Sequence, residues 1–313
     1  MPRTIFILGA GASLPYGFPL GSQLINDIIA YTKNTRQDTS RLYTLLRENF
    51  TAQEIDKFRS HIAATDVNSI DSFLYHNPDY LEIGKASMAC LLLECEARSG
   101  DFHEVVETDH WYKYLWNELV NEEPANYDFK IYTFNYERSL KEYLEHQTNF
   151  LIPSKERRGE LLENIKIIHL HGSLGEVRYG RIDKVLNYTD LKEIADNIKI
   201  IFEVETDENF KNLQNDIQNS TNVVFVGFGF HADNMKRLGF LTGEFKRLPH
   251  FYASTYGLKQ AQVDTKFIKF VRSSLYRHFK HHVKNISPYV DYSNAKNLEF
   301  LTELFPFHNL FKR

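Results

Sequence analysis

Cysteine is nearly absent from this chain of 313 residues, which contains only Cys90 and Cys95. Two cysteines five residues apart, in a run with helical character, exclude a disulfide framework and a four-cysteine zinc site. The 13 histidines are scattered and do not show the spacing of a metal-binding helix. No metal is therefore expected.

Long apolar runs are missing as well. The chain has no stretch of about 18 uninterrupted apolar residues, so no membrane-spanning helix is expected. The apolar run that follows Thr4 is too short for a signal peptide, and the sequence fits a cytoplasmic protein. The net charge is −4, which argues against nucleic-acid binding driven by bulk charge.

The order of the predicted elements indicates an α/β protein. Helical spacing alternates with runs that are typical of buried strands. Such strands are predicted over 4–8, 129–134, 165–170 and 222–226, with a further edge strand over 251–254. Strands that alternate with helices form βαβ units. The expected fold is therefore Rossmann-like, with a mostly parallel sheet and helices on both of its faces.

Strand signals vanish between residues 34 and 126, where helices are predicted over 41–49, 52–63, 70–75, 83–98 and 111–122. We interpret 34–126 as a helical module inserted into a NAD-binding sheet domain that comprises 1–33 and 127–260. Residues 261–313 are expected to form a helical or irregular extension that packs on the core.

A charged segment in this extension, 267–285, contains His278, His281 and His282 among basic and apolar residues. It is interpreted as the solvated face of a helix, because charge runs are usually surface. The alternative is a contact for an acidic partner.

The first candidate ligand loop follows the first strand and has the sequence Gly9, Ala10, Gly11, Ala12 and Ser13. Glycine lets a backbone approach a phosphate closely, and the helix predicted over 19–31 would offer free N–H groups at its start. Position 14 is leucine, so the dinucleotide spacing Gly-x-Gly-x-x-Gly is not met. A tight turn that binds nothing is the alternative.

Three further strand ends carry polar or glycine-rich motifs. They are Thr133-Phe134-Asn135-Tyr136-Glu137, His169-Leu170-His171-Gly172-Ser173 and Gly227-Phe228-Gly229-Phe230-His231. Ligands bind at the carboxyl ends of parallel strands, so these segments are expected to share one crevice with the glycine loop. The Asn135 amide can donate and accept hydrogen bonds, and His171 can act as a general base. Helix capping by Asn135 and a structural role for His171 are the alternatives.

Taken in this order, the four segments resemble the sirtuin-like family, and especially its bacterial NAD-hydrolysing branch. That family has a Gly-Ala-Gly-x-Ser loop, a Thr-Gln-Asn-x-Asp strand end, a His-Gly pair and a later Gly-Thr-Ser-type turn. The resemblance spans about residues 4–257, and the run Ser69-Ile70-Asp71-Ser72-Phe73-Leu74 looks like the helical module of the bacterial relatives. Phe134 and Glu137 depart from the family pattern, and the zinc cysteines of sirtuin deacylases are missing.

The resemblance implies an NAD+ pocket and cleavage of the nicotinamide–ribose bond by water, not protein deacylation. In the bacterial branch this reaction depletes NAD during antiphage (abortive infection) defence. Asn135 would then orient the carboxamide, the ribose or the attacking water, and His171 would accept a proton. Contacts to NAD are expected from the glycine loop and from Phe134, Glu137, Gly227, Phe228, Gly229 and Asn234.

Three alternatives stay open: a sensor that binds NAD or ADP-ribose without cleaving it, an NAD-dependent oxidoreductase, and a structural subunit of a defence complex. Retention of both Asn135 and His171 argues against a sensor. The imperfect glycine spacing argues against an oxidoreductase. Because uncontrolled NAD loss would kill the host, restraint by homo-oligomer formation or by a partner subunit, such as an ATPase or helicase, is expected.

Overall fold

The computed structural model describes residues 3–33, 40–67, 69–99, 109–175, 187–200, 203, 207–239, 249–273 and 290–312. Its centre is a six-stranded sheet with the order β3-β2-β1-β4-β5-β6, in which all the described strands pair in parallel. The strands are β1 (Thr4–Leu8), β2 (Phe129–Thr133), β3 (Ile167–His169), β4 (Asn222–Val226), β5 (His250–Ser254) and β6 (Val290–Ser293). The predicted Rossmann-like α/β fold is confirmed.

The last two strands differ from the prediction. β5 is not an edge strand, because β6 pairs with its outer side. β6 comes from the segment 261–313, for which helix or irregular chain was expected. Its sequence, Val290-Asp291-Tyr292-Ser293, has one buried apolar residue and so gives little strand signal. The sheet therefore extends one strand further than the apolar runs of the sequence indicate.

Alternating side chains bury both faces of the sheet. In β1, Phe6 and Leu8 join one apolar core, and Ile5 and Ile7 join the other. The first core is covered by α6 (Trp111–Val120), α7 (Ser139–Leu151) and α14 (Asn297–Glu303). The second is covered by α10 (Glu208–Asn219), α11 (Ala232–Arg237) and the π-helical turn Val263–Ile268 that continues α12 (Gln260–Gln262). Burial on both faces explains why the central strands are apolar throughout.

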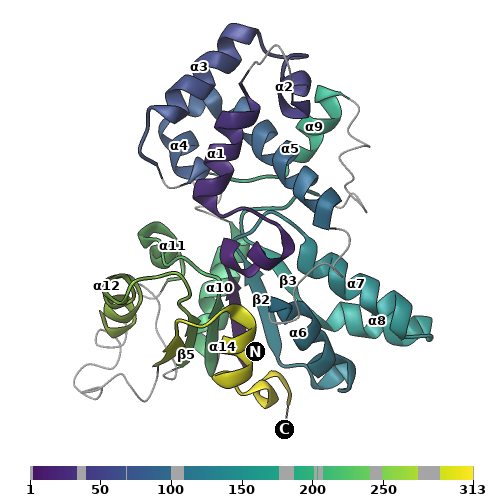
Figure 1. Cartoon of the computed structure of the whole chain (residues 1–313). Helices are drawn as coiled ribbons and strands as arrows, with labels where there is room; N and C mark the ends of the chain where they lie inside the picture. The colour runs from purple at the N-terminus through teal and green to yellow at the C-terminus, as the bar shows by residue number, and fades with distance from the viewer. Residues whose placement is uncertain are drawn as a thin grey trace.

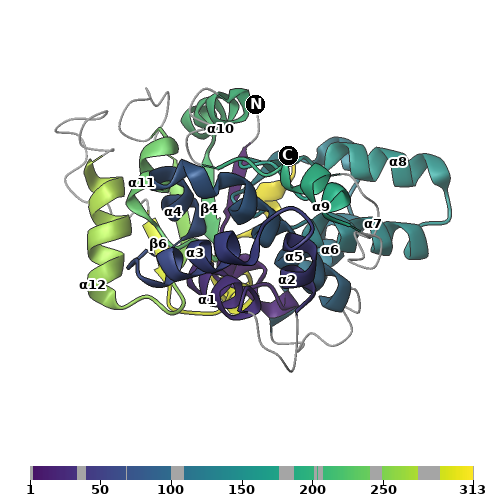
Figure 2. The ribbon, with the colours of Figure 1, turned by 90° about the horizontal axis from the view of Figure 1, so that it is seen from above.

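A group of six helices lies beyond the carboxyl ends of the strands, and seen from above it covers them (Figures 1 and 2). It comprises α1 (Gly21–Tyr31), α2 (Arg41–Leu46), α3 (Ala52–Ala63), α4 (Ile70–His76), α5 (Leu81–Ser99) and α9 (Tyr188–Ala195). We call this group the helical module. The long helix α5 is buried along most of its length and contacts α1, α2, α4 and α9. This burial is what its nearly uninterrupted apolar sequence predicts.

The helical module does not coincide with the insertion predicted over 34–126. α1 and α9 lie outside that block but pack against α5. α6 lies inside the block, yet it packs against α7 and α14 beside the sheet. The helices that pack together as the helical module are therefore not the same set as the helices within 34–126.

The remaining described elements are peripheral. α8 (Lys155–Asn164) packs against α7, and the two helices project from one side of the molecule (Figure 1). None of the helices in the described ranges has the length and apolar character needed to cross a membrane. Residues 274–289, with His278, His281 and His282, lie outside the described residues.

Two glycines give a matched test of this architecture. Gly227 has a φ of +58°, and a Cβ there would lie 1.9 Å from the backbone nitrogen of Ala12. We expect Gly227→Ala to lower the free energy of unfolding by more than about 2 kcal/mol. Gly159, within α8, has open space around it, and Gly159→Ala should raise the same quantity by about 0.5–1 kcal/mol.

Urea denaturation of the two variants beside the wild type measures both effects. Equal stability of Gly227→Ala and the wild type would contradict the close approach of the two loops.

Candidate functional site

The loops after β1, β2 and β4 meet where the strand order reverses. β1 lies between β2 and β4, and ligands of open parallel sheets bind at such a point, outside the carboxyl ends of the strands. The N–H of Gly11 donates to the carbonyl oxygen of Gly227 at 2.9 Å. The Nδ2 of Asn135 donates to the carbonyl oxygen of Gly9 at 3.1 Å. These bonds join three of the four predicted segments, and the fourth is joined to them where the N–H of Leu170 donates to the carbonyl oxygen of Thr133 at 2.9 Å.

A chain of buried hydrogen bonds fixes the Asn135 side chain. Its Nδ2 also donates to Ser13 Oγ at 2.9 Å, and Ser13 Oγ donates to Glu137 Oε1. The other oxygen of Glu137 accepts the backbone N–H of Ser139 at 2.6 Å. The carboxylate therefore anchors both the loop after β1 and the first turn of α7.

The orientation of this amide decides what Asn135 can do. Its Nδ2 faces acceptors of the protein itself, namely Gly9, Ser13 and Glu137. Within the described ranges, no donor reaches Oδ1. Asn135 therefore presents a hydrogen-bond acceptor. It does not cap α7, because the residue before that helix is Arg138.

The glycines of the first loop let two backbones approach each other. A Cβ on Gly9 would lie 2.7 Å from the carbonyl oxygen of Gly227, and one on Gly11 would lie 2.9 Å from the Gly227 Cα. Larger residues at these positions would push the loops after β1 and β4 apart. Contact between the loops is therefore one reason for the glycines, independent of any ligand.

The helix predicted over 19–31 is found as α1, but it does not start at the glycine loop. The chain forms two 3-10 turns, Ala10–Ala12 and Leu14–Tyr16, and α1 begins only at Gly21. The second turn contains Pro15 and ends at the left-handed Gly17. Backbone N–H groups of the loop donate to carbonyl oxygens of the chain, as seen for Gly11, Ala12 and Ser13.

His171 lies just beyond β3 in an aromatic enclosure. The rings of Phe134, Phe210 and Tyr136 surround it at centroid distances of 5.6, 5.7 and 6.1 Å. Its Nδ1 lies 3.2 Å from the carbonyl oxygen of Lys199. A carbonyl oxygen only accepts, so Nδ1 carries the hydrogen and Nε2 keeps its lone pair. Burial lowers the pKa of His171 and favours this neutral form.

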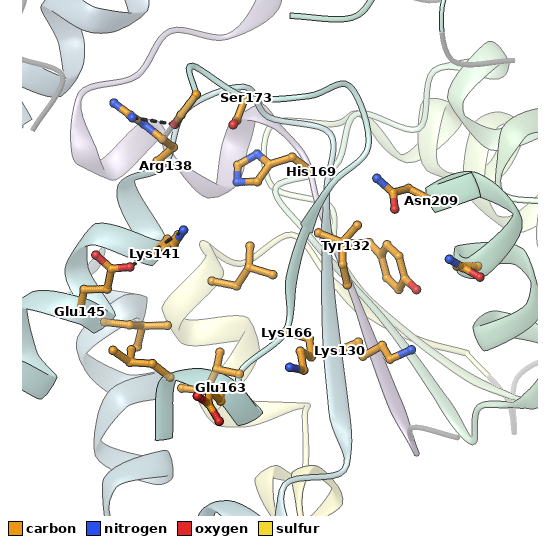
Figure 3. Close-up of a pocket in the computed structure, with 17 residues that line it drawn as sticks. Lys130, Tyr132, Arg138, Lys141, Glu145, Glu163, Lys166, His169, Ser173 and Asn209 are labelled. Carbon is orange, nitrogen blue, oxygen red and sulfur yellow. Dashed lines mark hydrogen bonds and ion pairs between the residues drawn. The ribbon is translucent and has the colours of Figure 1, made fainter. Parts of the chain in front are cut away.

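A hollow of about 650 Å³ lies beside β3 (Figure 3). Its lining includes His169, whose Nδ1 lies 2.9 Å from the carbonyl oxygen of Asn135. Arg138 and Lys141 line it on the side of α7, and Asn209 lines it from α10. The lining does not include the glycine loop, Asn135 or His171. This hollow therefore includes His169 and Ser173 of the third motif but none of the proposed catalytic side chains.

The other predicted NAD contacts lie around the same strand ends. Phe134 and Phe228 pack against each other with ring centroids 5.1 Å apart. Gly229 follows, and a Cβ there would lie 3.0 Å from the His231 ring. Asn234 lies on α11 and is half-exposed. Within the described ranges, no hydrogen bond joins it to Asn135 or His171.

Sequence reasoning missed several residues that support the site. Arg138, three residues after Asn135, forms a buried ion pair with Glu96 of α5. Asn297 of α14 donates to the carbonyl oxygen of Gly11 at 2.9 Å. The position of Glu96 close to the apolar stretch 88–93 of α5 was a signal that its carboxylate has a buried partner. No comparable signal marked Asn297.

Comparisons with known proteins identify no relative of this chain among family models or curated proteins. Any functional conclusion therefore depends on the site itself and on the motif resemblance.

The Ser13–Glu137 bond gives a second testable prediction. Ser13→Ala leaves the Asn135 amide and Glu137 without their shared partner, so we expect a loss of about 1–3 kcal/mol in the free energy of unfolding. Glu137→Ala removes the same link from its other end. The double variant should therefore lose less than the sum of the single losses, by about 1 kcal/mol or more.

Chemical denaturation of the four proteins measures this coupling. Strictly additive losses would show that the two residues act independently.

Proposed function

We propose that this chain is an NAD+ hydrolase, which cleaves the nicotinamide–ribose bond and releases nicotinamide and ADP-ribose. One observation carries the proposal. Asn135 follows β2, which pairs with β1 beside the switch point of the Rossmann-like sheet, and His171 follows the neighbouring edge strand β3. They offer an acceptor oxygen and a nitrogen lone pair. The resemblance of the four motifs to the sirtuin-like family supports the same reaction.

The chemistry of the reaction fits these two groups. The bond from the ribose C1′ to the nicotinamide nitrogen breaks, and its electron pair neutralises the positive charge of the ring. Nicotinamide therefore leaves without help from an acid. The ribose becomes oxocarbenium-like, as in glycoside cleavage, and water adds to C1′. Asn135 Oδ1 accepts a hydrogen bond from that water or from a ribose hydroxyl, and His171 Nε2 takes the proton.

The remaining contacts would hold the dinucleotide. We assign the aromatic surface of Phe134 and Phe228 and the close loops at Gly9–Ser13 and Gly227–Gly229 to NAD. Glu137 acts indirectly, because its carboxylate holds Ser13 and the first turn of α7.

One observation favours a second candidate, a structural subunit of a defence complex, over the hydrolase and over a non-catalytic NAD or ADP-ribose sensor. The glycine-loop amides of Gly11, Ala12 and Ser13 already donate within the chain, so the loop offers a phosphate fewer donors than a dinucleotide loop does. The two candidates differ in turnover, which the experiment below measures.

The proposed setting is antiphage defence by NAD depletion in the cytoplasm. We propose restraint by oligomer formation or by a partner subunit such as an ATPase or helicase. Phe150 and Leu151, at the end of α7, are 77% and 60% exposed and are a candidate contact for such a partner.

The test is incubation of the purified full chain with NAD, with nicotinamide and ADP-ribose followed by chromatography. We expect turnover by the wild type and a loss of about 10²-fold or more in Asn135→Ala and in His171→Ala. Asn164→Ala and His308→Ala are matched controls at exposed positions and should keep wild-type activity.

Thermal unfolding of each variant separates lost chemistry from lost structure, and calorimetry measures NAD binding. Binding without turnover would favour the sensor. Neither binding nor turnover, or full activity in both site variants, would overturn the proposed function.

A further inference from the structure

The helical module reaches the site through Asp71. This residue lies in α4, and its Oδ1 accepts a hydrogen bond from the hydroxyl of Tyr136. Tyr136 directly follows Asn135 in the chain, and its ring packs edge-on against that of His171, at an interplanar angle of 72°. A half-buried carboxylate of the module is therefore held beside the enclosure of His171.

Charged groups face His171 from the elements packed around it. Asp71 lies in α4, Arg237 lies in α11, and Asp207 is the residue that caps the start of α10. The carboxylate of Asp207 is paired with Lys199 Nζ at 2.7 Å. Burial raises the pKa of the Tyr136 hydroxyl far above its usual range, so Tyr136 stays a neutral donor.

These groups act on His171 in opposite directions. Burial has the largest effect and lowers the pKa of the imidazole. The charge of Asp71 raises that pKa, and the charge of Arg237 lowers it. Nδ1 is bonded to the carbonyl oxygen of Lys199, and among the described residues no hydrogen bond joins Asp71 to the ring, so Asp71 acts through space.

We propose that Asp71 is a positioning residue of this site: held by Tyr136, its charge stabilises the imidazolium that forms when His171 takes a proton. This inference rests on the proposed function and deepens it, because it makes the helical module part of the catalytic apparatus. A movement of α4 away from Tyr136 would withdraw the charge and weaken the base. The module is then the element through which restraint can act.

The test compares two variants with opposite expected effects. Asp71→Asn removes the charge but keeps an oxygen that can accept from Tyr136, and Arg237→Gln removes the opposing charge. Histidine-labelled full chain is titrated by NMR, with the His171 signal assigned from its absence in His171→Gln. The titration midpoint of His171 should move to lower pH in Asp71→Asn and to higher pH in Arg237→Gln.

The acid limb of kcat/KM for NAD cleavage should move in the same two directions, and kcat above that limb should fall roughly tenfold in Asp71→Asn. Asp79→Asn removes an exposed carboxylate near the end of α4 and is the control. It should leave both midpoints where they are in the wild type.

The outcomes separate this inference from the proposed function. An unmoved or raised His171 midpoint in Asp71→Asn overturns the inference, whether or not NAD is cleaved. Midpoints that move as expected in a chain that cleaves no NAD support the assignment of Asp71 to His171 and overturn the proposed function.

Discussion

The buried hydrogen bond from Ser13 to Glu137 joins the loop after β1 to the loop after β2, and the site depends on it. It holds Ser13 Oγ and Glu137 Oε1 in place, and these are two of the three acceptors that turn the Asn135 NH2 group toward the protein and its oxygen away. Gly9 and Gly11 then let the loop after β4 pack against the loop after β1 at Gly227. The Asn135 acceptor oxygen is therefore fixed by the packing of three strand ends and not by a flexible loop.

The four residues from Asn135 to Arg138 connect the two halves of the molecule. Asn135 and Glu137 bond to the sheet domain, whereas Tyr136 and Arg138 bond to Asp71 and Glu96 of the helical module. Along this segment, side chains thus bond alternately to the sheet domain and to the helical module. A change in how the module sits on the sheet would act directly on the backbone that carries Asn135, and this is the route that we propose for control of NAD cleavage.

The sequence predicted well whatever depends on local pattern. Apolar runs between glycines located β1 to β4, and the strand-end rule placed Asn135 next to the glycine loop. The start of α1 was predicted to within two residues, whereas the 3-10 turns before it, with Pro15 and the left-handed Gly17, were not predicted. The Tyr136–Asp71 and Arg138–Glu96 contacts join residues 65 and 42 positions apart, and no local pattern encodes such packing. The NAD reaction stays a prediction, since it rests on motif resemblance and on the chemistry of two side chains.

The most direct test of the account is the rate of nicotinamide release from NAD by the wild-type chain and by His171→Ala, measured across pH under otherwise identical conditions. The account predicts release by the wild type that falls as acid protonates His171, and almost none by the variant at any pH. No release by a wild type that is folded, or release by the variant at the wild-type rate, would contradict it.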